Sequence, residues 1–188
     1  MTADLGFPSD LTATIAAARR HGLGDLLART AARTPHRPAL IWRDETDTFG
    51  ELDAVVNRTA NGLAARGVRR GDRIAVFSHN CREFAVVYFA LAKLGAISVP
   101  INFMLNAEEV TYILDHSGAS GVVAEDALEP VITPAIGDRA MTVQGWIPLA
   151  GTAAPAGWED VAAWFAHPDA AAPVVVVGDD DPIQLMYT

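Results

Sequence analysis

Apolar residues recur along this chain with two periods, one typical of helices and the other of buried strands. Between residues 48 and 125, three stretches with apolar residues three or four positions apart alternate with short runs rich in Ile, Val and Ala. These runs predict strands at 73–77, 97–99 and 121–124. Strands separated by single helices must run parallel if they share a sheet. We therefore expect an α/β fold with a mostly parallel sheet covered by helices.

Polar residues mark the start of each of the three helices. In a capping box, the first side chain accepts a hydrogen bond from a free backbone N–H, and a glutamate three residues later reaches back. Three pairs have this spacing: Thr48 with Glu51, Asn80 with Glu83, and Asn106 with Glu109. Gly67, Gly95 and Gly118 follow the helices, where glycine readily takes the left-handed conformation that ends a helix.

The segments before and after residues 48–125 contain patterns of smaller elements. Residues 23–33 carry leucines at helical spacing, and prolines follow. The apolar run 39–42 and an acidic turn at 44–47 indicate a small hairpin or an edge strand. Beyond Glu125 the pattern weakens, because Pro and Gly interrupt every long element: Pro130, Pro134, Gly137, Pro148, Gly151, Pro155 and Gly157.

The region after Glu125 therefore supports only short elements. We expect no more than a short strand within 141–146 and one or two helical turns within 158–165. The β-branched residues 174–177 predict either a strand or a tightly packed segment. The acidic residues 179–181 predict a solvated turn.

Charge and cysteine content narrow the functional classes. The net charge of −9 and isoelectric point near 4.9 argue against nucleic-acid binding and against anionic membranes. The single cysteine, Cys81, allows neither an internal disulfide nor a cysteine metal cluster, which suits the cytoplasm. The N-terminus lacks the features of a secretory signal. The longest apolar stretch, 84–101, contains Lys93, Gly95 and Pro100, so we interpret it as a buried helix and strand without a membrane span.

The hydrophobic content of 51% and mean hydropathy of +0.20 are high against the roughly 45–50% apolar residues of ordinary soluble domains. One explanation is an alanine-rich composition. The other is an apolar surface that a partner segment absent from this sequence covers. The strand-like residues 184–188 have no capping or turn residue after them, and we interpret this end as a cut.

Two residue pairs imitate catalytic pairs. His79 and Cys81 flank Asn80 at a predicted helix start; because no paired base is identifiable, we interpret Cys81 as a small buried thiol. Asp115 and His116 are adjacent on a helix and must point in different directions, and a histidine near a helix C-terminus is explained by the helix dipole. No Gly-x-Gly-x-x-Gly follows a strand, so a dinucleotide-binding oxidoreductase is unsupported.

Several segments carry a more specific signal through their order and spacing. They include 23–40, 71–76 and 80–84, then Thr48-Phe-Gly-Glu-Leu52, Leu94-Gly-Ala-Ile-Ser-Val-Pro-Ile-Asn102, and Ala107-Glu-Glu-Val-Thr-Tyr-Ile-Leu-Asp-His-Ser-Gly118. Together they resemble the adenylate-forming enzymes, the acyl-CoA synthetase and ligase superfamily. Residues 48–52 and 94–102 are similar to the first two conserved motifs of that superfamily. Residues 107–118 are similar to the helix that follows in fatty-acid and aryl-acid CoA ligases. Residues 181–188 resemble the approach to its phosphate-binding loop.

The resemblance implies that the α/β fold is the first subdomain of the large N-terminal domain. Residues 1–22 would be an N-terminal extension, and residues 23–188 an incomplete N-terminal domain that stops just before the loop. The implied reaction has two steps. A carboxylate attacks the α-phosphate of ATP, releasing pyrophosphate, and the thiol of coenzyme A then displaces AMP from the acyl-adenylate, with Mg²⁺ neutralising phosphate charge.

By the same resemblance, Thr188 would be the first residue of the phosphate-binding loop and a nucleotide ligand. The alternative for Thr188 is a strand-end threonine without a ligand. The magnesium carboxylate and a catalytic lysine would lie beyond it, so residues 1–188 would contain no catalytic residue and no metal ligand. We expect this chain to be inactive alone.

The expected partners are a small carboxylic acid, fatty or otherwise hydrophobic, and the remaining C-terminal polypeptide of the same enzyme. A homodimer is a further candidate, since relatives of this type often dimerise. Two alternative functions remain open: an adenylation domain that loads a carrier protein, and a non-catalytic α/β module that binds a partner through its apolar surface.

Overall fold

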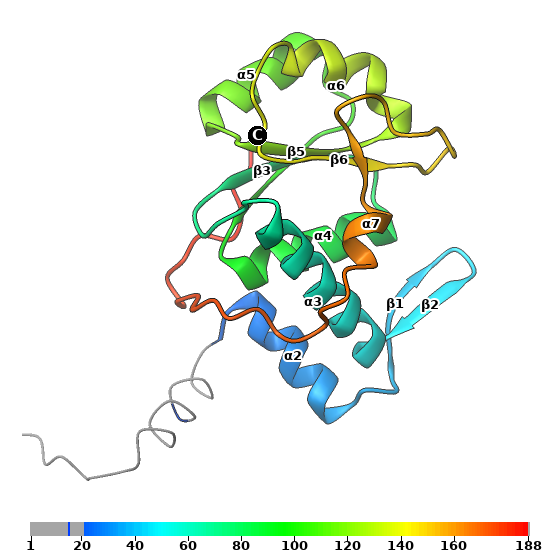
Figure 1. The fold of residues 1–188 in the computed structure, drawn as a ribbon, viewed down its shortest axis with the longest axis vertical. Helices are drawn as coiled ribbons and strands as arrows, with labels where there is room; N and C mark the ends of the chain where they lie inside the picture. Colours follow the sequence, from blue (N-terminus) through cyan, green and yellow to red (C-terminus); the bar gives the residue numbers. More distant parts are fainter. Residues whose placement is uncertain (1–14, 16–20, 188) are drawn as a thin grey trace, which may run out of the picture.

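A computed structural model describes residue 15 and residues 21–187, which are arranged in three layers (Figure 1). The middle layer is a parallel sheet with the strand order β4-β3-β5-β6-β7. Its strands are β3 (Arg73–Phe77), β4 (Ile97–Ile101), β5 (Gly121–Glu125), β6 (Gln144–Ile147) and β7 (Glu159–Asp160). The predicted α/β fold is confirmed, and each of the three predicted strands is present.

Helices cover both faces of this sheet. On one face lie α2 (Leu23–Arg33), α3 (Phe49–Ala65), α4 (Arg82–Leu94) and the short α7 (Ala162–Phe165). On the other lie α5 (Ala107–Ser117), the 3-10 helix η1 (Asp126–Leu128) and α6 (Glu129–Ile136). No described helix has the length and apolar character that crossing a membrane requires.

Alternate residues of β3 explain why the protein has two cores. Ile74 and Val76 belong to the first core, which includes residues of α3 and α4. Ala75 and Phe77 belong to the second core, which includes residues of α5 and α6. All four are fully buried. Successive strand residues point to opposite faces, so a strand covered on both faces must be apolar throughout.

Two of the three predicted capping boxes are present. The Thr48 hydroxyl accepts from the Glu51 N–H at 3.3 Å, and the Thr48 N–H donates to Glu51 Oε2 at 2.9 Å. Asn106 and Glu109 make the corresponding pair of bonds at the start of α5, at 3.1 and 2.9 Å. These bonds satisfy backbone donors that the first helical turn leaves free.

The predicted cap at Asn80 is wrong by one residue. Helix α4 is capped by Cys81, whose Sγ atom accepts a hydrogen bond from the Phe84 N–H at 3.3 Å. Cys81 is buried whereas Asn80 is exposed, so packing places the thiol at the helix start. At the other end of α4, Gly95 takes the expected left-handed conformation with φ 65°.

A separate hairpin precedes the sheet. Strands β1 (Pro38–Trp42) and β2 (Glu45–Thr48) pair antiparallel, and Arg43, with φ 51°, lies in the turn between them. The predicted turn at 44–47 was therefore too long, because most of it is β2. The reason is tertiary: Arg82 of α4 binds the Asp47 carboxylate through two hydrogen bonds of 2.6 and 2.8 Å.

The region after Glu125 contains more structure than its Pro and Gly content indicated. Helix α6 includes Pro130 in its first turn, where the missing N–H costs little, and Pro134 in its interior. Ile132, Ala135 and Ile136 of this helix are buried in the second core, and this burial stabilises the helix despite Pro134. The short strand expected within 141–146 is β6, and the 158–165 segment forms β7 and the single turn α7.

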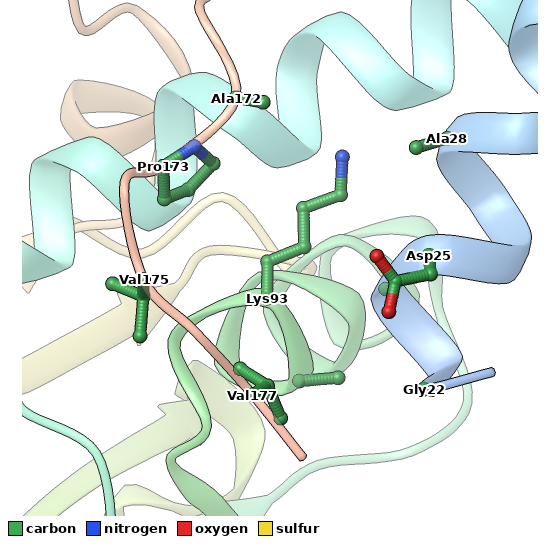
Figure 2. Close-up of a pocket in the computed structure, with 10 residues that line it drawn as sticks. Gly22, Asp25, Ala28, Lys93, Ala172, Pro173, Val175 and Val177 are labelled. Carbon is green, nitrogen blue, oxygen red and sulfur yellow. The ribbon is translucent and has the colours of Figure 1, made fainter. Parts of the chain in front are cut away.

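Residues 174–177 form a packed segment, which was one of the two predicted alternatives. Val175 packs against the first core and Val177 is buried, whereas Val174 and Val176 face outward. This segment is one wall of a pocket of about 100 Å³ whose opposite wall is α2 (Figure 2). Lys93 rises from α4 between the two walls.

Candidate functional site

The carboxyl ends of β3, β4 and β5 meet at one edge of the sheet. The chain leaves β3 toward α4 on one face but leaves β4 and β5 toward α5 and α6 on the other. Adjacent strands whose connections diverge in this way open a crevice at their carboxyl ends, the usual ligand position in open α/β sheets. The residues at this crevice are Ser78 and His79 after β3, Asn102 and Phe103 after β4, and Glu125 and Asp126 at the end of β5.

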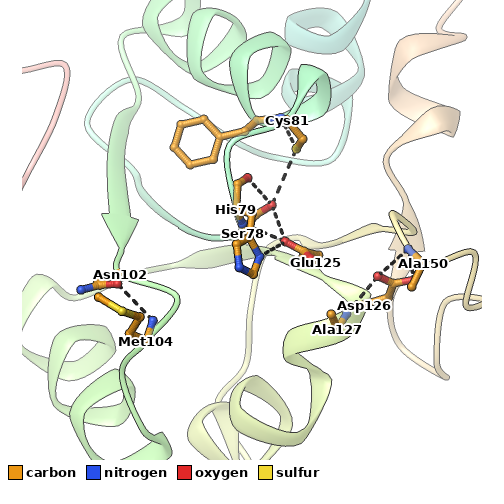
Figure 3. A network of polar contacts seen from close by, with 10 residues as sticks. Ser78, His79, Cys81, Asn102, Met104, Glu125, Asp126, Ala127 and Ala150 are labelled. Carbon is orange, nitrogen blue, oxygen red and sulfur yellow. Dashed lines mark hydrogen bonds and ion pairs between the residues drawn. The ribbon is translucent and has the colours of Figure 1, made fainter. Parts of the chain in front are cut away.

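Glu125 organises the centre of the crevice (Figure 3). Its Oε2 atom accepts hydrogen bonds from the His79 backbone N–H at 2.8 Å and from the Ser78 hydroxyl at 3.2 Å, and it lies 2.9 Å from His79 Nδ1. The Glu125 side chain is 7% exposed and that of His79 46%. A buried carboxylate thus orients a half-exposed imidazole, whose Nδ1 faces the carboxylate.

The ring of His79 is held from a second side by β4. Its centroid lies 3.9 Å from that of Phe103, with the ring planes tilted by 31°. Next to Phe103, Asn102 Oδ1 accepts from the Met104 N–H at 3.0 Å and shapes the turn after β4. The imidazole is therefore fixed by a carboxylate from β5 and by an aromatic ring that follows β4, the two strands on either side of β3.

Cys81 is not activated by His79. Its Sγ atom lies 3.7 Å from the Ser78 hydroxyl, and no contact with the histidine ring is present among the described residues. Burial raises the pKa of the Cys81 thiol to about 11. Because the thiolate is the nucleophilic form, Cys81 is a small buried thiol, as the sequence indicated. Its second role, as the cap of α4, was not predicted.

Asp126, the second carboxylate at this edge, builds a loop. Its carboxylate oxygens accept from the Ala150 N–H at 3.1 and 3.0 Å and from the Thr152 N–H at 2.9 Å, which fixes the chain after β6. Sequence analysis overlooked both Glu125 and Asp126. The sequence does contain a signal for them, because two acidic residues directly follow the apolar run 121–124, which was predicted as a strand.

Neither carboxylate is arranged as a metal ligand. Glu125 Oε2 is engaged by donors from Ser78 and His79, and both Asp126 oxygens accept backbone N–H groups. In the part of the chain that the structure describes, no group of three or more His, Cys, Asp or Glu side chains could hold a metal ion. Glu125 and Asp126 therefore do not fit an Mg²⁺ site.

The approach to the predicted nucleotide loop lies at the free edge of β4. Gln184 forms a parallel bridge with Ser98, and Tyr187 packs against the second core. An open groove of about 590 Å³ lies beside it, lined by Asn102, Leu105, Glu108, Glu109, Tyr112, Ile113 and Tyr187. Thr188 itself lies outside the described residues, so its nucleotide contact stays a prediction.

The structure separates Asp115 from His116, as their adjacency on a helix required. Asp115 accepts two hydrogen bonds of 2.8 Å from Arg139, whereas His116 Nδ1 lies 2.8 Å from the Tyr187 hydroxyl. The two side chains do not form a catalytic pair. His116 instead connects α5 to the approach to the predicted loop.

A model of the family described as AMP-binding enzyme matches residues 27–188. The chain belongs to the AMP-binding enzyme family. The chain is 35% identical over 171 residues to the long-chain-fatty-acid–CoA ligase FadD13 of Mycobacterium tuberculosis, covering 88% of this chain and 32% of that protein. It is also 35% identical over 170 residues to a feruloyl-CoA synthase of an Amycolatopsis species, covering 90% of this chain and 31% of that enzyme.

Solved structures agree with this assignment. The N-terminal domain of FACL13 from M. tuberculosis superposes with a TM-score of 0.76 at 34% identity, covering 89% of this chain and 42% of that one. An anthranilate CoA ligase, AuaEII, shares the fold with a TM-score of 0.82 at 24% identity, covering 90% of this chain and 32% of that one. The chain spans about a third of the length of the FadD13 ligase and the feruloyl-CoA synthase.

Proposed function

We propose that this chain is the N-terminal part of an ATP-dependent, AMP-forming acyl-CoA synthetase. One observation carries the proposal: both relatives that are 35% identical over about nine tenths of the chain are named as enzymes that form acyl-CoA thioesters. The division into an extension at 1–22 and an incomplete domain at 23–188 is part of this proposal. So are a cytoplasmic location and a homodimer.

The proposed substrate is a hydrophobic carboxylic acid. The two relatives are named for a long-chain fatty acid and for ferulic acid, which share a carboxylate on an apolar body. The carboxylate would attack the α-phosphate of ATP and release pyrophosphate, and coenzyme A would then displace AMP. A free carboxylate acylates poorly, so the protein must mainly position the reactants and stabilise phosphate charge.

The residues of this chain have supporting roles in that scheme. Thr188 would begin the phosphate-binding loop, and residues 183–187 would carry it along the edge of β4. The adjoining crevice, with His79 oriented by Glu125, would form part of the wall on which the remainder of the enzyme closes. Catalytic groups would come from that remaining polypeptide.

Carboxylate-dependent exchange of pyrophosphate into ATP tests the proposal. The polypeptide that combines this chain with the remainder of the enzyme is expected to catalyse exchange with fatty or aryl acids, and to form a thioester when coenzyme A is added. Residues 1–188 alone are expected to be inactive. Exchange without thioester formation, restored by a carrier protein, would favour the carrier-loading alternative. No exchange with any acid would refute the proposal.

A further inference from the structure

The segment that leads to Thr188 is held to the sheet by few backbone bonds. The Ser98 N–H donates to the Ile183 carbonyl at 3.0 Å, and the Leu185 N–H donates to the Ser98 carbonyl at 2.9 Å. Among the described residues, neither Met186 nor Tyr187 has a backbone hydrogen bond. A sheet edge joined through one residue does not by itself fix the position of the chain that follows.

Two side chains hold this segment from opposite faces of the sheet. From α4, the Tyr88 hydroxyl donates to Gln184 Oε1 at 2.8 Å. From α5, His116 Nδ1 lies 2.8 Å from the Tyr187 hydroxyl, and the two rings meet edge to face with centroids 5.7 Å apart. Gln184 and Tyr187 are three residues apart, an odd spacing that directs them to opposite sides of an extended chain.

Each contact is itself supported. The ring of Tyr88 lies against that of Phe84, one turn earlier on α4, with centroids 6.5 Å apart and planes within 19°. The ring of His116 stacks on that of Tyr112, one turn earlier on α5, with centroids 5.4 Å apart and planes within 21°. Neither Tyr88 nor His116 depends on the loop itself for its orientation.

We propose that Tyr88 and His116 are positioning residues that hold residues 183–187 so that the phosphate-binding loop begins at a fixed place. This inference rests on the proposed function, because it takes Thr188 as the start of that loop. Both residues act through the segment and touch no substrate. The loop must present its hydrogen-bond donors to a triphosphate, and donors oriented in advance bind and stabilise charge better than mobile ones.

Hydrogen exchange of the Leu185 amide in residues 1–188 tests the structural half of the inference. The variant Tyr88→Phe removes only a hydroxyl and is expected to accelerate this exchange about fivefold, the effect of one net hydrogen bond. The matched control is Tyr112→Phe, which removes a hydroxyl that makes no hydrogen bond within the described residues, and which should leave the Leu185 rate unchanged.

A second pair of variants addresses His116. His116→Leu removes its hydrogen bond to Tyr187 and should also accelerate exchange of the Leu185 amide. In His116→Asn the side-chain amide can occupy the place of Nδ1, and the wild-type rate should return. If Tyr88→Phe and His116→Leu exchange like the wild type, Tyr88 and His116 do not position the segment and the inference fails.

Kinetics of the complete enzyme test the functional half. In the pyrophosphate exchange assay, Tyr88→Phe and His116→Leu are expected to raise KM for ATP about fivefold while KM for the acid stays constant. His116→Asn should restore KM for ATP. An unchanged KM for ATP in both variants of an active enzyme would overturn the positioning role alone. An inactive wild-type enzyme would overturn the proposed function, and the positioning role with it.

Discussion

The Lys93 ammonium group lies 2.6 Å from the Asp53 carboxylate, which places a charged pair between α3 and α4. The Lys93 side chain is 6% exposed and that of Asp53 20%. Asn57 Oδ1 accepts a further bond from Lys93 at 2.6 Å, and the Asn57 amide donates to Asp53 Oδ2 and to the Ala170 carbonyl. The lysine that in the sequence argues against a membrane span is thus a buried ion with hydrogen bonds to Asp53 and Asn57.

Removing Asp53 should lower the free energy of unfolding more than removing Lys93. Asp53→Ala leaves a buried ammonium group without its counter-ion and should lower the free energy of unfolding by about 3 kcal/mol. Lys93→Met removes the buried charge, keeps the apolar stem, and leaves Asp53 with access to water, so it should cost clearly less. Urea unfolding at neutral pH measures both. A larger loss for Lys93→Met would contradict this account.

Two glycines lie against Trp164, and replacing each by alanine should change the stability of the protein in opposite directions. A Cβ atom at Gly145 would overlap the Trp164 ring, so Gly145→Ala should destabilise the protein by about 2 kcal/mol. A Cβ atom at Gly62, inside α3, would meet the Trp164 backbone at an ordinary 3.4 Å. Gly62→Ala should therefore stabilise by up to about 1 kcal/mol through helix propensity. Equal thermal midpoints for the two variants would refute the packing described at Trp164.

The Cys81 thiol should resist alkylation in the native protein. Its pKa is raised to about 11 by burial, so at pH 8 only about one thiol in a thousand is ionised. Iodoacetamide should label it about a hundredfold more slowly than in concentrated urea, where the usual pKa returns. Cys81→Ser gives the background. Native labelling at the unfolded rate would show that the thiol is exposed and ionised.

The ion pair between Arg66 and Glu159 should make the stability of the protein depend on pH below the ordinary glutamate pKa. Hydrogen bonds from Arg66 hold the pKa of Glu159 below its ordinary value of 4.5. A carboxyl with a lowered folded pKa stabilises the fold above the unfolded pKa, and this contribution is lost as the pH falls through the folded value. Wild type should exceed Glu159→Gln in urea midpoint at pH 7, by a margin that shrinks below about pH 4.5. A constant margin down to pH 3 would be inconsistent with this pair.

Local sequence was sufficient to predict the elements that repeat a simple pattern. The capping boxes at Thr48 and Asn106, and the strands at 73–77, 97–99 and 121–124, are all present, though β4 and β5 extend further. Helical and strand periodicity record which side of each element is buried, and caps satisfy nearby backbone groups. Both are short-range effects, so the sequence reveals them directly.

Tertiary structure decided what depends on strand order. His79 and Glu125 are 46 residues apart in the chain and meet only because β3 and β5 are neighbours; Tyr88 reaches Gln184 across 96 residues. The cap at Cys81 and the persistence of α6 despite Pro134 likewise depend on which side chains the packed cores bury. The sequence by itself determined the three helices and three strands between residues 48 and 125, and the family resemblance. Contacts between distant elements required the assembled sheet, because burial energy is shared across the whole core.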